Sequence, residues 1–193
     1  MTAVAIVVMG VAGAGKTTVG QLLANQLRCA FLDADSLHPP ANIAKMTHGV
    51  PLSDGDRAPW LAAIHARIVD SSQRNEALVV ACSALRQQYR DTLADGVAIT
   101  WVYLKDSEQM ICARLQLRQH HFMTAQMLAS QFADLEEPTD AIVIDAAVAP
   151  AAAVRQILSA LRLIQASNKT AEASRRDLLK LGIASIFAAS LCL

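Results

Sequence analysis

A glycine-rich octapeptide near the start of the chain has the residues needed to bind phosphate groups. Residues 10–17 read Gly-Val-Ala-Gly-Ala-Gly-Lys-Thr, which matches the pattern G-x-x-x-x-G-K-[ST]. Glycines at this spacing let the backbone N–H groups approach phosphate oxygens without an intervening Cβ. The Lys16 ammonium would contact the β- and γ-phosphates, and the Thr17 hydroxyl would bind Mg²⁺. The segment therefore predicts a site for the phosphates of a nucleotide with a magnesium ion.

Two carboxylates, Asp33 and Asp35, follow a second apolar segment. If the chain is still extended there, their side chains point in roughly opposite directions and can have different roles. We assign Asp33 to the magnesium side. We assign Asp35 to an acceptor hydroxyl, which it would orient for in-line attack on the γ-phosphate. The alternative is that both acids cap the following turn.

Arg57 lies in the polar segment 53–60, which is expected to open a helix. A guanidinium can bind a substrate carboxylate through two parallel hydrogen bonds. The alternative is a surface ion pair with Asp54 or Asp56, which would contribute little to stability. Beside a phosphate-binding loop, we favour the substrate-binding role.

Basic residues gather again where a helix predicted over Ser107–Arg118 gives way to a loop. We expect Arg114 to bind nucleotide and Arg118 to act catalytically as part of a lid, neutralising the transferring phosphoryl group and excluding water. The alternative for Arg118 is a solvated helix end. His120 and His121 are adjacent and cannot share a helical face, so a metal-binding pair is not expected.

The segment Leu78–Ser83 ends without the acidic residue that many phosphate-loop ATPases place there to hold Mg²⁺ through water. This absence argues against a motor or a GTPase-like switch. It favours a small-molecule kinase whose metal support comes from Asp33.

Alternating apolar segments and helical patterns must position these residues. Such alternation predicts a three-layer α/β fold with a five-stranded parallel sheet, whose ligands bind beyond the carboxyl ends of the strands. The predicted strands are Val4–Met9, Cys29–Asp33, Ala77–Cys82, Ala98–Leu104 and Ala141–Asp145. The predicted helices are Lys16–Leu27, one around Trp60–Ile68 with Pro59 near its start, Ser107–Arg118, one around Met127–Leu135 ended by Pro138, and Pro150–Gln165.

The composition narrows the class of protein. The 193 residues include 17 Lys and Arg and 17 Asp and Glu, so the net charge is zero and no general attraction to nucleic acid or anionic membrane is expected. The four cysteines have no zinc-ligand spacing, which favours reduced thiols in a cytoplasmic protein. The first apolar segment leads into the glycine-rich loop, so it reads as a strand and not as a signal peptide.

Together these segments resemble the bacterial gluconate kinases, short ATP-dependent enzymes of the shikimate and nucleoside monophosphate kinase group. The resemblance covers about residues 3–165. The residues that carry it are Met9-Gly10-Val11, Phe31 to Asp35, Leu37-His38-Pro39, Asn42, Lys45-Met46, Gly49, Pro51-Leu52, Asp54, Asp56-Arg57, Pro59-Trp60-Leu61, Cys82 to Leu85, Tyr89-Arg90, Tyr103-Leu104, His121-Phe122, Met127-Leu128, Gln131-Phe132, Leu135 and Glu137-Pro138.

The resemblance implies a phosphate-loop kinase fold with a helical lid, and transfer of the ATP γ-phosphoryl group to the C6 hydroxyl of D-gluconate. It also implies that the family often forms homodimers. The alternatives are a kinase for another small acid such as shikimate, or a non-catalytic ATP-binding regulatory protein. The expected catalytic residues are Lys16, Asp35 and Arg118, and the expected metal ligands are Thr17 and Asp33. The expected nucleotide contacts are Gly10, Val11, Ala12, Gly13, Ala14, Gly15, Lys16, Thr17, Thr18 and Arg114. The expected substrate contacts are Asp35, His38, Lys45, Arg57 and Arg90.

The composition changes after Ala166, so we expect a kinase domain over residues 1–166 and an atypical tail over 167–193. The tail contains Arg175-Arg176 before the apolar segment Leu181–Leu193 and resembles a twin-arginine export signal. The apolar segment is too short to cross a bilayer, which takes about 20 residues. One hypothesis is that the tail is the start of a neighbouring gene joined by a fusion or a reading-frame event. The alternatives are an added helix that packs on the domain or a partner, and peripheral membrane attachment.

Overall fold

The computed structural model describes residues 5–116, 125–164 and 166. Residues 1–155 and the segment from residue 156 onward form separate compact units, and each is described by itself. Arg118, His120, His121 and the tail 167–193 lie outside the described residues, so their predicted roles stay predictions.

The first unit contains a five-stranded sheet in the order β2-β3-β1-β4-β5, and all the strand pairs are parallel. The strands are Ala5–Met9 (β1), Ala30–Asp33 (β2), Leu78–Ala81 (β3), Ile99–Lys105 (β4) and Ile142–Asp145 (β5). The central strand β1 is buried along its whole length, and its Val7 lies beside Val80 on one side and Trp101 on the other. Near-continuous apolar strands of this kind form because both faces of a parallel sheet are covered. The predicted α/β fold is confirmed.

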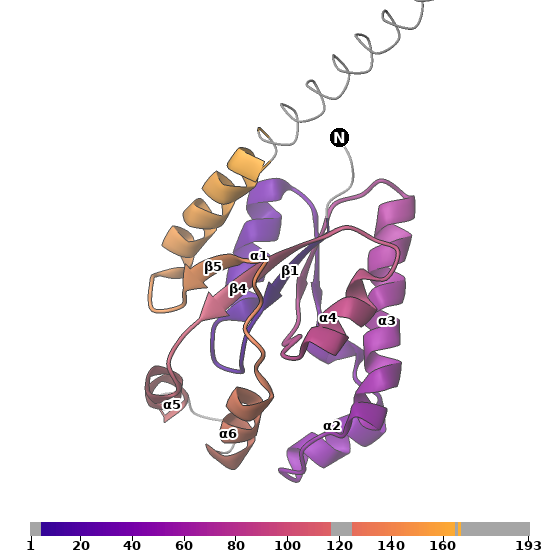
Figure 1. Ribbon diagram of the computed structural model, residues 1–193, viewed down its shortest axis with the longest axis vertical. Helices are drawn as coiled ribbons and strands as arrows, with labels where there is room; N and C mark the ends of the chain where they lie inside the picture. Colours follow the sequence, from indigo (N-terminus) through magenta and orange to yellow (C-terminus); the bar gives the residue numbers. More distant parts are fainter. Residues whose placement is uncertain (1–4, 117–124, 165, 167–193) are drawn as a thin grey trace, which may run out of the picture. The chain divides into compact units, whose positions relative to one another are not determined.

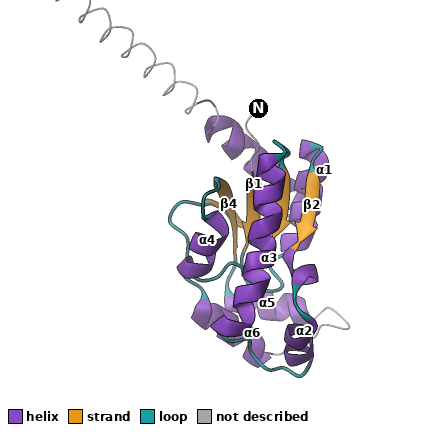
Figure 2. Cartoon of the chain, turned by 90° about the vertical axis from the view of Figure 1, so that its right-hand side faces the viewer, coloured by secondary structure: helices purple, strands orange, loops and turns teal. Residues whose placement is uncertain are grey.

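Helices cover both faces of the sheet. Helix α1 (Lys16–Leu27) lies on one side, and α3 (Asp54–Gln73) with α4 (Gln87–Ala94) lies on the other (Figure 1). Three further helices, α2 (Pro40–Thr47), α5 (Glu108–Gln116) and α6 (Ala125–Asp134), lie beyond the carboxyl ends of the strands. Figure 2 shows the same unit turned so that α3 runs across the viewer's side of the sheet. Residues 150–164 are helical, as the sequence predicts.

Helix α3 positions Arg57, and it begins at Asp54, five residues before Pro59. A capping box fixes its start: Asp56 N–H donates to Ser53 Oγ at 3.2 Å, and Ser53 N–H donates to Asp56 Oδ2 at 2.9 Å. These reciprocal bonds satisfy backbone donors that a helix start leaves without partners. Arg57 therefore lies in the first turns of a well-defined helix.

Helix α6 ends earlier than its sequence suggests. The sequence predicts helical residues through Leu135 with Pro138 as the terminator, and the helix stops at Asp134. Glu136 N–H donates to Leu85 O at 2.9 Å, outside the helix. This bond ties the end of α6 to the loop that follows β3.

The core between the sheet and α3 is apolar and holds one polar anchor. Trp60, Leu61, Ile64 and Ile68 from α3 are buried against the sheet, and each such side chain stabilises the fold by about 1.5–3 kcal/mol. Trp60 Nε1 donates to Ala34 O at 2.7 Å. The bond connects α3 to the short 3-10 helix η1 (Ala34–Leu37), which follows β2 and carries Asp35. Within the described ranges, no helix has the length and apolar character that a membrane crossing requires.

Candidate active site

The glycine-rich loop connects β1 to α1, and its first glycine has no room for a side chain. Gly10 has φ 138°, and a Cβ there would lie 2.8 Å from the backbone oxygen of Leu104. Gly15, at φ 94°, turns the chain into α1. Gly10 N–H donates to Ser83 O at 3.3 Å, which ties the loop to the segment after β3. The N-terminal end of α1, with its partial positive charge, follows directly and favours an anion.

Lys16, the first residue of α1, is held inside the loop. Its Nζ donates to Val11 O at 3.0 Å. Burial lowers the pKa of Lys16, and the nearby carboxylate of Asp35 opposes that shift. The ammonium group therefore contacts the loop backbone and is influenced by the charge of Asp35.

Thr17 and Asp33 form the candidate metal site. The Thr17 hydroxyl donates to Asp33 Oδ2 at 2.8 Å, while Asp33 Oδ1 accepts the Asp35 N–H at 3.1 Å. A hydroxyl and a carboxylate are oxygen ligands of the kind Mg²⁺ prefers, and this ion keeps most of its waters when it binds protein. The donor set therefore fits a magnesium ion held by one or two side chains. Within the described ranges, no group of three or more His, Cys, Asp or Glu residues is placed so that it could hold a metal ion.

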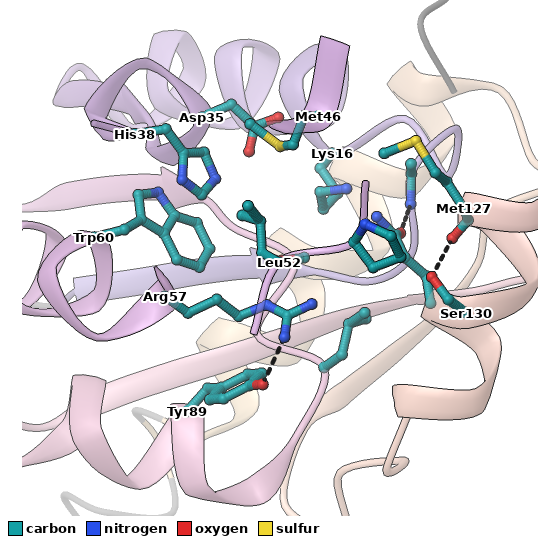
Figure 3. Close-up of a pocket in the computed structure, with 15 residues that line it drawn as sticks. Lys16, Asp35, His38, Met46, Leu52, Arg57, Trp60, Tyr89, Met127 and Ser130 are labelled. Atoms are coloured by element: carbon teal, nitrogen blue, oxygen red, sulfur yellow. Dashed lines mark hydrogen bonds between the residues drawn. The ribbon is translucent and has the colours of Figure 1, made fainter. Parts of the chain in front are cut away.

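A pocket beyond the loop brings several predicted residues together. Lys16, Asp35, His38 and Arg57 all line it, as does Ala12 of the loop. Figure 3 shows that Lys16 and Arg57 approach this pocket from different elements, with Asp35 and His38 near its edge. Asp33 and Asp35 have different contacts, because the chain turns into η1 after Asp33 and is not extended as assumed from the sequence. Asp33 contacts Thr17, whereas Asp35 lines the pocket.

Arg57 is oriented by its neighbours on two other helices. Its Nη1 donates to the Tyr89 hydroxyl at 3.1 Å, and its Nη2 donates to Asp134 Oδ2 at 3.4 Å. The guanidinium also lies 5.5 Å from the centre of the Tyr89 ring, within the range of a cation–π contact. The ion pair with Asp54, which was the alternative to substrate binding, exists at 3.7 Å, yet the Arg57 side chain is only 18% exposed. Arg57 is therefore a partly buried, oriented cation at the pocket.

His38 closes one side of the pocket by stacking on Trp60. The two ring centroids are 4.3 Å apart and the planes differ by 10°. Asn42 Nδ2 lies 3.4 Å from His38 Nδ1 and donates to Asp56 O at 2.7 Å. Burial lowers the pKa of His38, and Asp35 opposes this effect. Neutral His38 thus provides a flat, weakly polar wall.

Two other predicted substrate residues do not line the pocket. Lys45 forms an ion pair with Asp56, with Nζ 2.7 Å from Oδ1. Arg90 is 2% exposed, and its Nη1 donates to the backbone oxygens of Ala84 and Leu85 at 3.0 and 3.1 Å. Arg90 therefore positions the loop after β3. The sequence predicts a substrate contact for Arg90, whereas its guanidinium contacts backbone oxygens of this loop.

Arg114, predicted to bind nucleotide, forms an ion pair with Asp106 at the end of β4. Its Nη1 lies 2.8 Å from Asp106 Oδ2, and the Asp106 side chain is 5% exposed. This pair connects the last turn of α5 to the residue that follows β4. The predicted lid residue Arg118 lies beyond the described part of α5.

The pocket residues that received no role from the sequence include three polar ones: Tyr89, Ser130 and Gln131. Gln131 is the most informative, because its Oε1 accepts the N–H of Ala12 in the phosphate loop at 2.7 Å. A sequence signal existed for it. Gln131 lies four residues after Met127, so a polar side chain falls on the apolar face of α6.

Comparisons with known proteins decide the family. The shikimate kinase family profile matches residues 12–162. The chain is 44% identical over 144 residues to the thermoresistant gluconokinase of Escherichia coli K12, covering 72% of this chain and 82% of that protein. It is 47% identical over 136 residues to the gluconokinase of Gluconobacter oxydans 621H, covering 70% and 76%. The chain belongs to the shikimate kinase family, among its gluconokinases.

Solved structures of this family agree. The crystal structure of a gluconokinase from Sinorhizobium meliloti 1021 superposes with a TM-score of 0.75 at 41% identity, covering 84% of this chain and 94% of that one. The shikimate kinase of Aquifex aeolicus superposes with a TM-score of 0.50 at 16% identity, which shows the shared fold alone. The predicted resemblance to gluconokinases and the interpretation as a kinase are confirmed.

Proposed function

We propose that the protein phosphorylates D-gluconate at its C6 hydroxyl with ATP, giving 6-phosphogluconate and ADP. The observation that carries the proposal is that Lys16, Asp35 and Arg57 line the same pocket. It combines a phosphate-binding cation, a carboxylate able to orient a hydroxyl, and a cation able to bind an acid. Relatives at 40–47% identity that carry the name gluconokinase support the same acceptor. They disfavour shikimate and a non-catalytic role.

Different pocket residues bind ATP, activate the acceptor hydroxyl and bind the acceptor carboxylate. The amides of the phosphate loop and Lys16 hold the β- and γ-phosphates of ATP. Asp35 accepts a hydrogen bond from the acceptor hydroxyl and takes up its proton as the hydroxyl oxygen attacks phosphorus in line with the leaving oxygen of ADP. Arg57 binds the substrate carboxylate at the far end, and His38 with Trp60 forms an adjacent wall. Positioning and electrostatic stabilisation supply most of the rate enhancement in reactions of this class.

Thr17 and Asp33 would hold Mg²⁺, directly or through water. When bound, the ion neutralises charge on the phosphate oxygens. Thr17 is the second residue of α1 and directly follows Lys16, so the loop and the metal site are built from consecutive residues. The hydrogen bond between Thr17 and Asp33 supports this assignment, because it aligns both oxygen donors beside the loop.

The remaining roles of the predicted residues follow from their contacts. We propose that Arg90 positions the loop after β3, and that Lys45 acts with Asp56 at the edge of the acceptor side. Arg118 stays our expected lid residue, and Arg114 a residue of the nucleotide side. We further propose a cytoplasmic homodimer. The free cysteines among the described residues, Cys29, Cys82 and Cys112, agree with a reducing compartment.

We propose that residues 1–166 carry the activity and that 167–193 come from a junction with a neighbouring gene. A chain ending at Ala166 should then fold and turn over as the full chain does. Intact-mass measurement of the protein from its native host should find no kinase ending at Leu193. If truncation destroys folding, the tail packs on the domain and the junction hypothesis is wrong.

A coupled assay of ADP release tests the function. The full chain is incubated with ATP, Mg²⁺ and, separately, gluconate, shikimate and related sugar acids. Gluconate should give the highest kcat/KM, and Lys16→Ala purified in parallel should lose that activity, which excludes a contaminating kinase. Shikimate turnover above gluconate turnover would replace the proposed acceptor. No turnover with any acid, despite ATP binding, would favour the regulatory role.

A further inference from the structure

Two side chains of helix α6, one turn apart, contact the phosphate loop and Arg57 on different sides of the pocket. Gln131 accepts the N–H of Ala12 in the phosphate loop at 2.7 Å. Asp134 accepts from Arg57 Nη2 at 3.4 Å. At a spacing of three residues the two side chains lie on the same side of the helix. One rigid element therefore touches the loop that holds phosphate and the arginine that we assign to the acceptor.

The contact with Ala12 is specific in its chemistry. A backbone N–H can only donate, so the oxygen of the Gln131 amide faces the loop. Residues 12 and 131 are far apart in sequence, and the same loop is held on its other side by the bond from Gly10 to Ser83 O. The position of Ala12 therefore depends on α6 as well as on the sheet. A nucleotide whose phosphates accept hydrogen bonds from the loop amides would therefore change the hydrogen bond between Ala12 and Gln131.

The contact with Arg57 involves a partly buried carboxylate. The Asp134 side chain is 18% exposed and pairs with Arg86 as well as with Arg57. Asp134 thus holds two guanidinium groups side by side and orients Arg57 toward the pocket, together with Tyr89. A substrate carboxylate at Arg57 would compete with Asp134 for the same donors, because a guanidinium has a limited number of N–H groups.

We propose that Gln131 and Asp134 are positioning residues that couple nucleotide binding to acceptor binding through α6. The inference rests on the proposed function, in which Arg57 binds the acceptor. In this proposal, both ligands act on α6. Thermodynamic linkage then requires that each ligand changes the affinity for the other by the same factor. Coupling of this kind commonly changes affinity by about 5- to 150-fold.

Calorimetric titration of the full chain with gluconate, with and without a non-hydrolysable ATP analogue and Mg²⁺, measures this factor. We expect the analogue to change the gluconate Kd at least about fivefold in the wild-type protein. Gln131→Leu and Asp134→Asn should each bring the factor close to one while both ligands still bind. Gln73→Leu, at an exposed position, and Asp70→Asn, at a half-exposed one, both lie near the end of α3 and are matched controls that should keep the wild-type factor.

A second measurement does not depend on the identity of the acceptor. In wild-type protein, the ATP analogue alone should change hydrogen exchange in the first turns of α3, around Arg57, and Gln131→Leu should abolish that change. Gln131→Met, which keeps the length of the side chain without its acceptor oxygen, serves if Gln131→Leu does not fold. An unchanged exchange pattern in wild-type protein, or coupling retained in both variants, overturns the inference. If gluconate is not phosphorylated but the exchange change occurs and needs Gln131, the proposed substrate is wrong and the coupling stands.

Discussion

The Thr17 hydroxyl donates a hydrogen bond to Asp33 Oδ2 over 2.8 Å, joining the first turn of α1 to the carboxyl end of β2. Strands β1 and β2 are not neighbours, since β3 lies between them. The bond therefore crosses the carboxyl edge of the sheet, where ligands of open α/β folds bind. It places the predicted metal support beside the phosphate loop, although β3 ends without an acidic residue.

Asp33→Asn should weaken the response to magnesium. The amide keeps the shape of the side chain but removes the charge that would hold the ion, so the Mg²⁺ concentration for half-maximal activity should rise about tenfold or more. Titrating MgCl₂ at fixed ATP measures this value. Asp70→Asn, a change at an exposed aspartate of α3, is the control. An unchanged magnesium requirement would remove Asp33 from the metal site.

Asp35→Asn should reduce kcat by about 10²- to 10⁴-fold, because an amide cannot take up the proton of the acceptor hydroxyl. The KM for ATP should change little, since the phosphate loop is untouched. Steady-state kinetics gives both values, and circular dichroism checks the fold. A kcat within threefold of wild type would show that Asp35 does not act on the acceptor.

Arg57→Met should raise the KM for gluconate while the KM for ATP stays near its wild-type value. A hydrogen bond to a charged group contributes about 1.5–3 kcal/mol, which corresponds to roughly 10- to 150-fold in affinity. Arg74→Met, at the exposed end of α3, is the matched control. Equal increases in both KM values would indicate a general structural role and contradict carboxylate binding.

Most of the fold could be predicted from apolar segments and turn chemistry. The predicted strand Ala77–Cys82 corresponds to Leu78–Ala81, and the predicted helix Lys16–Leu27 is the observed α1. The eight-residue helices α2 and α4 were not predicted. Their apolar faces are too short to show a clear period, and α2 buries Asn42 in place of an apolar residue. Tertiary contacts, more than local pattern, stabilise such short helices.

The site was predictable where a motif fixes the backbone and less so where packing decides. The loop motif located Lys16 and Thr17 because phosphate binding needs that backbone shape. Arg90 could not be placed in this way, since nothing in its sequence neighbourhood shows that its guanidinium turns toward the carbonyls of Ala84 and Leu85. For Gln131, the spacing from Met127 shows a polar side chain on the apolar face of α6, but it does not identify Ala12 as the partner, because that contact joins distant segments.

Ser53→Ala should lower the free energy of unfolding by about 1 kcal/mol, because the hydroxyl accepts the Asp56 N–H at the start of α3. Urea unfolding measures the change. Ser72→Ala, at an exposed position near the other end of α3, should stay within about 0.5 kcal/mol of wild type. Equal stabilities for the two variants would mean that the capping box does not stabilise the helix.

His38 should make the protein less stable as the pH falls. Burial against Trp60 lowers its pKa below the ordinary value of 6.5, so the unfolded chain binds the proton more readily than the folded protein. Above pH 6.5, the contribution of His38 to the free energy of unfolding does not change with pH. As the pH falls from 6.5 toward the lower pKa of the folded protein, that contribution decreases. In His38→Gln this part of the pH dependence should be missing. Urea unfolding from pH 5 to pH 8, about the range in which histidine titrates, tests it; parallel curves for both proteins would contradict it.

The most direct test of the account is identification of the product by ³¹P and ¹H NMR after incubating the full chain with ATP, Mg²⁺ and D-gluconate. The proposed reaction should give ADP and an equal amount of a phosphomonoester on C6 of gluconate. ADP accompanied only by free phosphate, phosphorylation at another carbon, or unreacted gluconate would contradict it.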